Sequence, residues 1–304
     1  MKIGFIFAGQ GSQYVGMGKD FYDQYEVARD VYQSADIDFD VASLCFEGPS
    51  DLLNETSYAQ PCLLTTSLAI SKVLESYGIV PDYVAGLSLG EYSALSYAKA
   101  MSIKDAIQIV RKRGQLMSNA LPAGKTSMAA VLAMDPQDIQ RVIQDIDGVT
   151  IANYNCPGQI VITGMKEAVE KAGEKLKEAG AKRVIPLKVS GAFHSPLLEE
   201  ASYQLKEELE KYTIQKPEIP VVYNISGKEE DGDIVDILTK QIKSSVYFYQ
   251  SLEYMIDKGI DMFVEIGPGK ALSAFVKKTN RQIPVYSIDN VENLKQLLEV
   301  LKNE

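Results

Sequence analysis

The sequence has very little histidine and cysteine, and both shortages limit the chemistry that it can carry out. Its three cysteines (Cys45, Cys62 and Cys156) lie far apart and form no C-x-x-C pair, which argues against a disulfide framework and a zinc site. We expect each of them to be a small core or loop residue in a reducing compartment. The single histidine is His194, so any reaction that needs an imidazole base must use this residue.

Long apolar runs are missing as well. No segment approaches the roughly 20 apolar residues that span a membrane, and the apolar start, residues 2–7, is too short for a signal peptide. We therefore expect a soluble, cytoplasmic protein without membrane contact. The formal net charge of −10 argues against nucleic-acid binding, so an acidic protein partner would have to dock on a local basic patch.

A chain of 304 residues can form one large α/β domain, or a large domain that carries a smaller one. Strand-like apolar segments alternate with helical periodicity through most of the chain, which predicts a mostly parallel sheet covered by helices. We expect strands in this part at 2–7, 82–86, 220–226 and after 259, and helices at 21–36, after Pro61 as far as Gly78, at 91–101 and at 103–121.

The middle of the chain follows a different order, β-α-β-β-α-β, which is typical of a ferredoxin-like unit. Its strands are expected at 126–134, 149–155, 159–164 and 181–189, and its helices at 135–146 and 165–180. We therefore predict a small ferredoxin-like domain at 125–189, inserted into a large α/β domain that comprises 1–124 and 190–304.

The segment "GLSLGEY", residues 86–92, has the G-x-S-x-G spacing of a nucleophile elbow, with Ser88 at its centre. In such a turn a strand reverses sharply into a helix and holds the serine hydroxyl at the tip. Gly86 and Gly90 would be required because a Cβ at either position would collide with the neighbouring strand or helix. The alternative is an ordinary helix N-terminus with serine as its cap.

A serine hydroxyl becomes a good nucleophile only when a positioned base removes its proton, and histidine is the usual base. His194 lies where the chain leaves the proposed small domain, and a loop that enters a cleft between two domains suits a catalytic group. The alternative is a lone loop histidine without a chemical role. No aspartate follows Ser88 in an elbow-like loop, so a backbone carbonyl is expected to orient the histidine in a Ser-His dyad.

Acyl transfer also needs hydrogen-bond donors for the oxyanion of its tetrahedral intermediate. Elbow geometry makes the backbone N–H of Leu89 one donor, and the amide of Gln10, in the loop after the first strand, is the best candidate for the other. The same loop has Tyr14 where a G-x-G-x-x-G motif needs glycine. Neither "GMGKD" nor "IGPGKAL" completes a P-loop, which disfavours nucleotide-phosphate binding.

Five segments occur in an order that resembles one known family. They are "FAGQGSQ" after the first strand, "GLSLGEYSAL", "RGQLM", "GAFHSP" and "EIGPGKAL". Together they resemble the malonyl-CoA:acyl carrier protein transacylases, the acyltransferases of dissociated fatty-acid synthesis, over essentially the whole chain. The resemblance implies an α/β-hydrolase-like large domain with a ferredoxin-like small one, which agrees with the element order.

The resemblance also implies an activity. A malonyl group would pass from malonyl-CoA to the phosphopantetheine thiol of an acyl carrier protein, in a ping-pong reaction through an ester on Ser88. His194 would be the general base and acid, with the oxyanion hole formed by the backbone amides of Gln10 and Leu89. No cofactor or metal would be needed beyond the coenzyme A thioester that serves as substrate, and we expect a monomer.

Further residues acquire roles from the resemblance alone. Arg113 matches the arginine that grips the malonyl carboxylate, which a guanidinium can do through two parallel hydrogen bonds. The alternative for Arg113 is one charge in a solvated "RKR" helix turn. Gln241 matches a glutamine whose main-chain carbonyl orients the histidine. The walls of the cleft are expected to include Phe193, whose bulk leaves little room for a 2-methyl branch, and, on the coenzyme side, Asn153 and Asn155.

The sequence departs from the family pattern at two places. Leu87 replaces a histidine before the nucleophile, at a position expected to point away from the reacting hydroxyl. Residues 244–250, "SSVYFYQ", lack a proline, an arginine and a tryptophan of the family, which puts the shape of that loop in question. Three other hypotheses remain: a serine hydrolase acting on acyl carrier protein thioesters, a trans-acting acyltransferase of polyketide synthesis, and a catalytically silent binding module.

Overall fold

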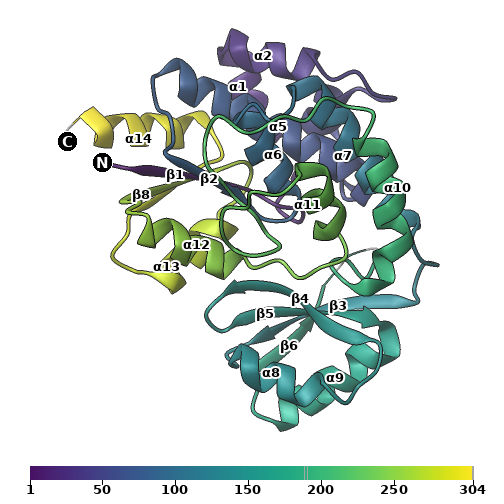
Figure 1. Cartoon of the computed structure of the whole chain (residues 1–304). Helices are drawn as coiled ribbons and strands as arrows, with labels where there is room; N and C mark the ends of the chain where they lie inside the picture. Colours follow the sequence, from purple (N-terminus) through teal and green to yellow (C-terminus); the bar gives the residue numbers. More distant parts are fainter. Residues whose placement is uncertain (188, 190, 303–304) are drawn as a thin grey trace.

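The computed structural model describes residues 1–187, 189 and 191–302, and it contains two separate sheets (Figure 1). The five-stranded sheet is entirely parallel, with the strand order β7-β2-β1-β8-β9. Its strands are β1 (Ile3–Phe7), β2 (Tyr83–Gly86), β7 (Val221–Val222), β8 (Met262–Ile266) and β9 (Val285–Ile288). The prediction of a mostly parallel sheet is confirmed, although β9 was not expected from the sequence.

Helices cover both faces of this sheet. Side chains of the central strand β1 alternate between the faces: Phe5 and Phe7 enter the larger core, and Ile6 enters a second core beneath α12 and α13. This two-sided burial explains why β1 is apolar throughout. The helices are α1 (Lys19–Gln24), α2 (Glu26–Gln33), α3 (Val41–Glu47), α4 (Ser50–Leu53), α5 (Thr56–Ser76), α6 (Leu89–Tyr97), α7 (Ile103–Asn119), α10 (Glu199–Leu209), α11 (Ile234–Gln241), α12 (Phe248–Asp257), α13 (Ala271–Thr279) and α14 (Val291–Lys302), with a short 3₁₀ turn at Pro196–Leu198.

The second sheet is antiparallel and has the order β4-β5-β3-β6. Its elements follow one another as β3 (Thr126–Leu132), α8 (Pro136–Ile143), β4 (Val149–Cys156), β5 (Gln159–Met165), α9 (Lys166–Glu178) and β6 (Arg183–Pro186). The expected β-α-β-β-α-β order is therefore confirmed. Both helices lie on one face of the sheet, below it in Figure 1, where they close a core of their own.

The last strand of this sheet, β6, ends at Pro186 and not at the expected residue 189. The predicted domain boundary falls at Ser190, which lies outside the described residues, as does Lys188. The exact division into domains therefore stays a prediction.

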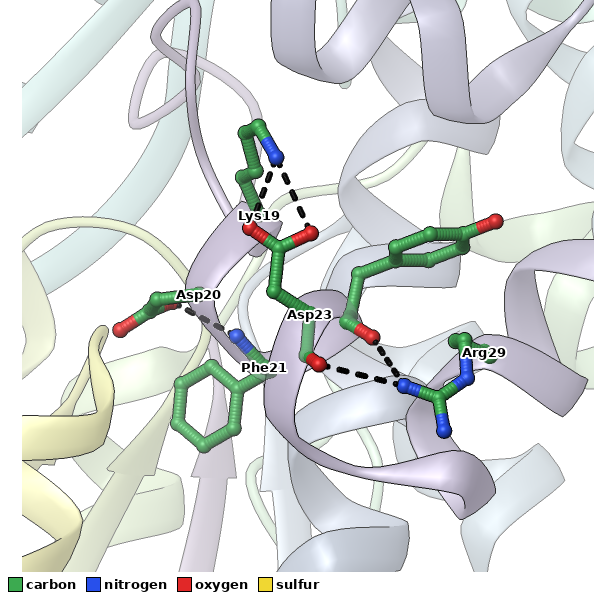
Figure 2. A network of polar contacts seen from close by, with 6 residues as sticks. Lys19, Asp20, Phe21, Asp23 and Arg29 are labelled. Atoms are coloured by element: carbon green, nitrogen blue, oxygen red, sulfur yellow. Dashed lines mark hydrogen bonds and ion pairs between the residues drawn. The ribbon is translucent and has the colours of Figure 1, made fainter.

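The helix expected at 21–36 is wrong as a single element, because the chain breaks at Tyr25 into α1 and α2. Tyr25 is extended, with φ −125° and ψ 123°. Figure 2 shows how the break is stabilised: Arg29 Nη1 donates to the main-chain carbonyls of Tyr22 (2.9 Å) and Asp23 (3.3 Å), which end α1 without helical partners. On the same turn Lys19 forms an ion pair with Asp23.

The long helix α5 also differs from its prediction, because it begins at Thr56 and contains Pro61. A proline inside a helix lacks the N–H that would bond the carbonyl four residues earlier, here that of Ser57. Arg111 Nη1, from α7, donates to this carbonyl at 2.7 Å. The helix therefore continues through the proline because a residue of another helix replaces the missing donor.

Candidate active site

Ser88 lies at a sharp turn between β2 and α6, as the elbow prediction requires. Its φ of 54° and ψ of −99° are unusual for a residue with a side chain, and such strain costs roughly 1–3 kcal/mol. A Cβ on Gly86 would overlap the backbone of Gly90, and a Cβ on Gly90 would overlap the carbonyl of Phe7 in β1. Both glycines are thus required for the close approach of helix and strand.

The hydroxyl of Ser88 is paired with the single histidine. Ser88 Oγ lies 2.7 Å from His194 Nε2, and His194 Nδ1 lies 2.9 Å from the main-chain carbonyl oxygen of Gln241. Because a carbonyl can only accept, Nδ1 carries the proton and Nε2 is free to accept the proton of Ser88. The predicted orientation of the histidine by a backbone carbonyl agrees with this geometry.

Burial keeps this histidine neutral. His194 is 4% exposed, and burial, assisted by the positive charge of Arg113, lowers its pKa to about 4, although its bond to the Gln241 carbonyl acts in the opposite direction. At neutral pH the imidazole is thus deprotonated at Nε2, the state that a general base requires.

Arg113 points into the same site and is fully buried. Its Nη2 donates to Ser88 Oγ (3.1 Å) and to Gln241 Oε1 (3.0 Å), and its Nη1 donates to Gln60 Oε1 (2.9 Å). This burial contradicts the alternative of a solvated charge in the "RKR" turn. Burial lowers the pKa of Arg113, but a guanidinium stays charged in proteins, so the site holds a positive charge beside the nucleophile.

A cavity of about 560 Å³ opens beside Ser88 and His194. Of the residues expected along the cleft, Gln10, Phe193, Asn153 and Asn155 all line this cavity. Asn155 Oδ1 has no hydrogen-bond partner among the described residues. Leu87 lines the cavity too, and its side chain packs against the second core and lies next to Gly9. That this side chain points away from the reacting hydroxyl stays a prediction.

Of the two expected oxyanion donors, Leu89 follows the nucleophile in the chain and Gln10 lines the same cavity. Leu89 is the first residue of α6, so its N–H has no acceptor within the helix. Gln10 follows β1, and its side chain is held by a 2.9 Å bond to Thr56 Oγ1. The assignment of their amides to an oxyanion hole stays a prediction.

Three residues of the site were not expected from the sequence: Gln60, Glu91 and Asn224. Gln60 supports Arg113, as described above. Asn224 bonds the backbone of the elbow, and Glu91 Oε2 accepts from the main-chain N–H of Asn224. Glu91 is completely buried, which raises its pKa to about 8. Asn224 fell inside the strand predicted at 220–226, but β7 ends at Val222, so the sequence held no separate signal for this residue.

The departure at residues 244–250 leaves the loop well connected. Val246 bridges to β4, with its N–H donating to Ala152 O and its carbonyl accepting from Tyr154 N, both at 2.8 Å. The rings of Tyr154 and Tyr247 stack, 4.9 Å apart between centroids and 8° from parallel. This segment therefore joins the antiparallel sheet to the active-site region.

Phosphate binding at "IGPGKAL" finds no support. The carboxylate of Glu265 already accepts from Leu272 N (2.9 Å) and Ser273 N (2.8 Å), so it occupies the N-terminus of α13 where a phosphate would bind. Within the described residues, no cluster of His, Cys, Asp or Glu could hold a metal ion. No helix in the same part of the chain is long and apolar enough to cross a membrane.

A strained serine elbow, a neutral histidine within hydrogen-bond distance and a buried guanidinium form a site suited to covalent acyl transfer. A model of the family described as acyl transferase domain matches residues 4–299. The chain belongs to this family and is an acyltransferase, as the resemblance predicted.

The relatives are similar over their whole length. The malonyl CoA-acyl carrier protein transacylase of Bacillus subtilis is 46% identical over 311 aligned positions, covering 100% of this chain and 98% of the relative. The crystal structure of the transacylase of the same name from Clostridium perfringens is 43% identical, with a TM-score of 0.97 over 100% of this chain and 98% of that one. A malonyl-transacylase solved in complex with a type II PKS acyl-carrier protein is 36% identical, with a TM-score of 0.95 over 98% and 99% of the two chains.

Proposed function

We propose that this protein transfers the malonyl group of malonyl-CoA to the phosphopantetheine thiol of an acyl carrier protein, in fatty-acid biosynthesis. One observation carries the proposal: Ser88 Oγ lies 2.7 Å from His194 Nε2 and also 3.1 Å from the buried Arg113 Nη2. The base and a cation suited to the malonyl carboxylate are thus both within hydrogen-bond distance of the nucleophilic oxygen. The names of the relatives support the substrate and the acceptor.

In the first half-reaction Ser88 Oγ attacks the thioester carbonyl of malonyl-CoA while His194 Nε2 takes its proton. The backbone amides of Leu89 and Gln10 stabilise the oxyanion, and losing one such donor typically costs about 2.7–4 kcal/mol in the transition state. The C–S bond then breaks, and coenzyme A leaves as a thiol with the proton from Nε2. The malonyl group remains as an ester on Ser88.

The second half-reaction runs through the same atoms in reverse. His194 Nε2 takes the proton of the phosphopantetheine thiol, and the sulfur attacks the serine ester. Collapse of the tetrahedral intermediate breaks the C–Oγ bond, and Oγ regains the proton from Nε2. Because Gln241 fixes the proton on Nδ1, the same tautomer serves both halves.

Arg113 accounts for the choice of acyl group. In the free protein one Nη2–H is directed at Ser88 Oγ, and Nη1 has a second N–H beyond the one that Gln60 accepts. An end-on pair of bonds from Nη1 and Nη2 can therefore hold the malonyl carboxylate. An acetyl group would offer the buried charge no carboxylate partner, which disfavours acetyl-CoA.

The alternative hydrolase of mixed acyl carrier protein thioesters has no use for this cation. The polyketide alternative is closer, because one relative was solved with a type II PKS carrier protein; it differs in the carrier and not in the chemistry. We further propose that the protein acts in the cytoplasm as a monomer, without a cofactor.

The test is intact-protein mass spectrometry after mixing the enzyme with malonyl-CoA in the absence of an acceptor. We expect one malonyl adduct per chain, mapped by peptide fragmentation to Ser88 and absent from the Ser88→Ala variant. Cys156→Ala is the matched control, because it removes another nucleophilic side chain and should keep the adduct. An unmodified parent enzyme, or an adduct mapped to a cysteine, would refute the proposal.

A further inference from the structure

The nucleophile elbow needs an external support, because its own geometry is unfavourable. Ser88 adopts φ 54° and ψ −99° without being glycine. A residue in such a conformation keeps it only when surrounding contacts hold the backbone. The main chain on both sides of Ser88 is therefore the place to look for these contacts.

The side chain of Asn224 makes two of them. Its Oδ1 accepts from the main-chain N–H of Ser88 at 2.7 Å, and its Nδ2 donates to the main-chain carbonyl of Gly86, also at 2.7 Å. A carboxamide has the donor and acceptor of a peptide group, so it can pair with two backbone groups of one strand. β7 pairs with β2 only through Val221 and Val222. The side chain of Asn224 thus continues the hydrogen bonding between the two strands as far as the elbow, beyond the end of the regular strand pairing.

Asn224 is itself held rigidly. It is completely buried, its N–H donates to Glu91 Oε2, and its carbonyl accepts from Tyr247 N at 2.8 Å. Glu91 belongs to α6, the helix that begins directly after Ser88. The bonds therefore form a closed ring from the elbow to Asn224 and back through Glu91 to the helix that the elbow starts.

We propose that Asn224 is a positioning residue, which holds the Ser88 backbone so that Oγ stays within reach of His194 Nε2. Its side-chain amide bonds the main-chain groups of Ser88 and Gly86, whereas Arg113 bonds Oγ itself. The inference rests on the proposed function, since Ser88 must be the nucleophile for its position to matter. The turn that carries Oγ also carries the N–H of Leu89, so a displaced elbow would weaken the nucleophile and the proposed oxyanion donor together.

The test compares the rate of Ser88 acylation by malonyl-CoA in the parent enzyme and in Asn224→Ala. We expect kcat to fall by about a hundredfold, the cost that a misplacement of about 1 Å carries, with little change in KM because neither Asn224 bond reaches the substrate. Ser71→Ala is the matched control: it removes an equally buried side chain that bonds a carbonyl, Leu68 O at 2.8 Å, within α5 and away from the elbow. It should keep the parent's kcat.

The pH dependence of kcat in Asn224→Asp is a second test of the proposal, and it remains available if the alanine variant does not fold. A protonated carboxyl can donate to Gly86 O and accept from Ser88 N, whereas a carboxylate repels that carbonyl. The titratable and charged groups near this position are Glu91 on α6, the neighbouring Tyr223, whose pKa is raised by burial and by the charge of Glu91, and Arg113 and His194 at Ser88 Oγ. We expect kcat relative to the parent to rise severalfold as the pH falls from about 8 to about 6.

Two results would overturn the inference: a folded Asn224→Ala protein with kcat within about threefold of the parent, or an impaired Asn224→Asp protein whose relative kcat does not rise at the lower pH. The failure of the proposed function would look different, because then the parent enzyme itself would not acylate Ser88.

Discussion

Replacing Arg113 by alanine should abolish the preference for malonyl over acetyl groups. The guanidinium can give the malonyl carboxylate two charge-assisted hydrogen bonds from Nη1 and Nη2, each contributing roughly 1.5–3 kcal/mol in a site shielded from water. Two such bonds amount to about 3–6 kcal/mol, and about 1.4 kcal/mol corresponds to a factor of ten. The parent enzyme should therefore favour malonyl-CoA over acetyl-CoA by at least about a hundredfold in kcat/KM.

The ratio of the two substrates separates this effect from damage to the fold. Arg113→Ala also leaves Gln60 Oε1 and Gln241 Oε1 without their donor, which should lower stability and slow both substrates. Loss of the carboxylate contact slows malonyl-CoA alone, so the ratio should fall toward one. Arg113→Lys should restore it only in part, because an ammonium cannot form the two parallel bonds.

The assay is kcat/KM for both thioesters, with coenzyme A release as the signal. Lys104→Ala is the matched control, because it removes a positive charge from the same helix, where Lys104 pairs with Asp36 at the surface and not with the site. It should keep the parent's ratio. A parent enzyme that does not discriminate, or an Arg113→Ala variant that slows both substrates equally, would refute the assignment of Arg113 and favour the hydrolase.

Four further predictions concern His194 and Gly90. His194→Ala should remain folded by circular dichroism while transfer falls by about 10²–10⁴-fold, the usual contribution of a general base; near-normal turnover would exclude this base. Because burial lowers the pKa of His194 to about 4, kcat/KM should stay level from neutral pH down to about 5 and fall only below it, and an inflection near 6.5 would contradict the buried, neutral imidazole. The free energy of unfolding should decrease as the pH falls from about 6.5 to about 4, because in this pH range His194 of the unfolded chain binds a proton more tightly than His194 of the folded protein. Gly90→Ala should lower the melting temperature strongly because its Cβ would overlap Phe7 O, whereas Gly232→Ala, with no atom closer than 3.7 Å to its Cβ, should change it little.

The elbow and the order of strands and helices along the chain could be predicted because their signals are local. The spacing of Gly86, Ser88 and Gly90 expresses a steric requirement within one turn, and the alternation of apolar strands and helices expresses burial on two faces. The single histidine left one choice of base. These features need no knowledge of which distant segments meet.

The residues that the sequence did not reveal depend on contacts between segments that lie far apart in the chain. Asn224 lies 136 residues after Ser88 and acts on it only because β7 pairs with β2. The start of α5 before Pro61 depends on Arg111, 54 residues after Ser57. A local pattern holds no signal for any of these contacts.

The central claim is that a serine ester passes its malonyl group to a thiol and not to water. The most direct measurement is a single-turnover chase: enzyme carrying radiolabelled malonyl on Ser88 is freed of coenzyme A and mixed with holo-acyl carrier protein, and the label is followed on both proteins. We predict that the label moves to the carrier protein in a stoichiometric step much faster than its loss as free malonate, and that the carrier protein without phosphopantetheine accepts none. Release of free malonate at the same rate with and without the holo-carrier, with no labelled carrier formed, would contradict the account.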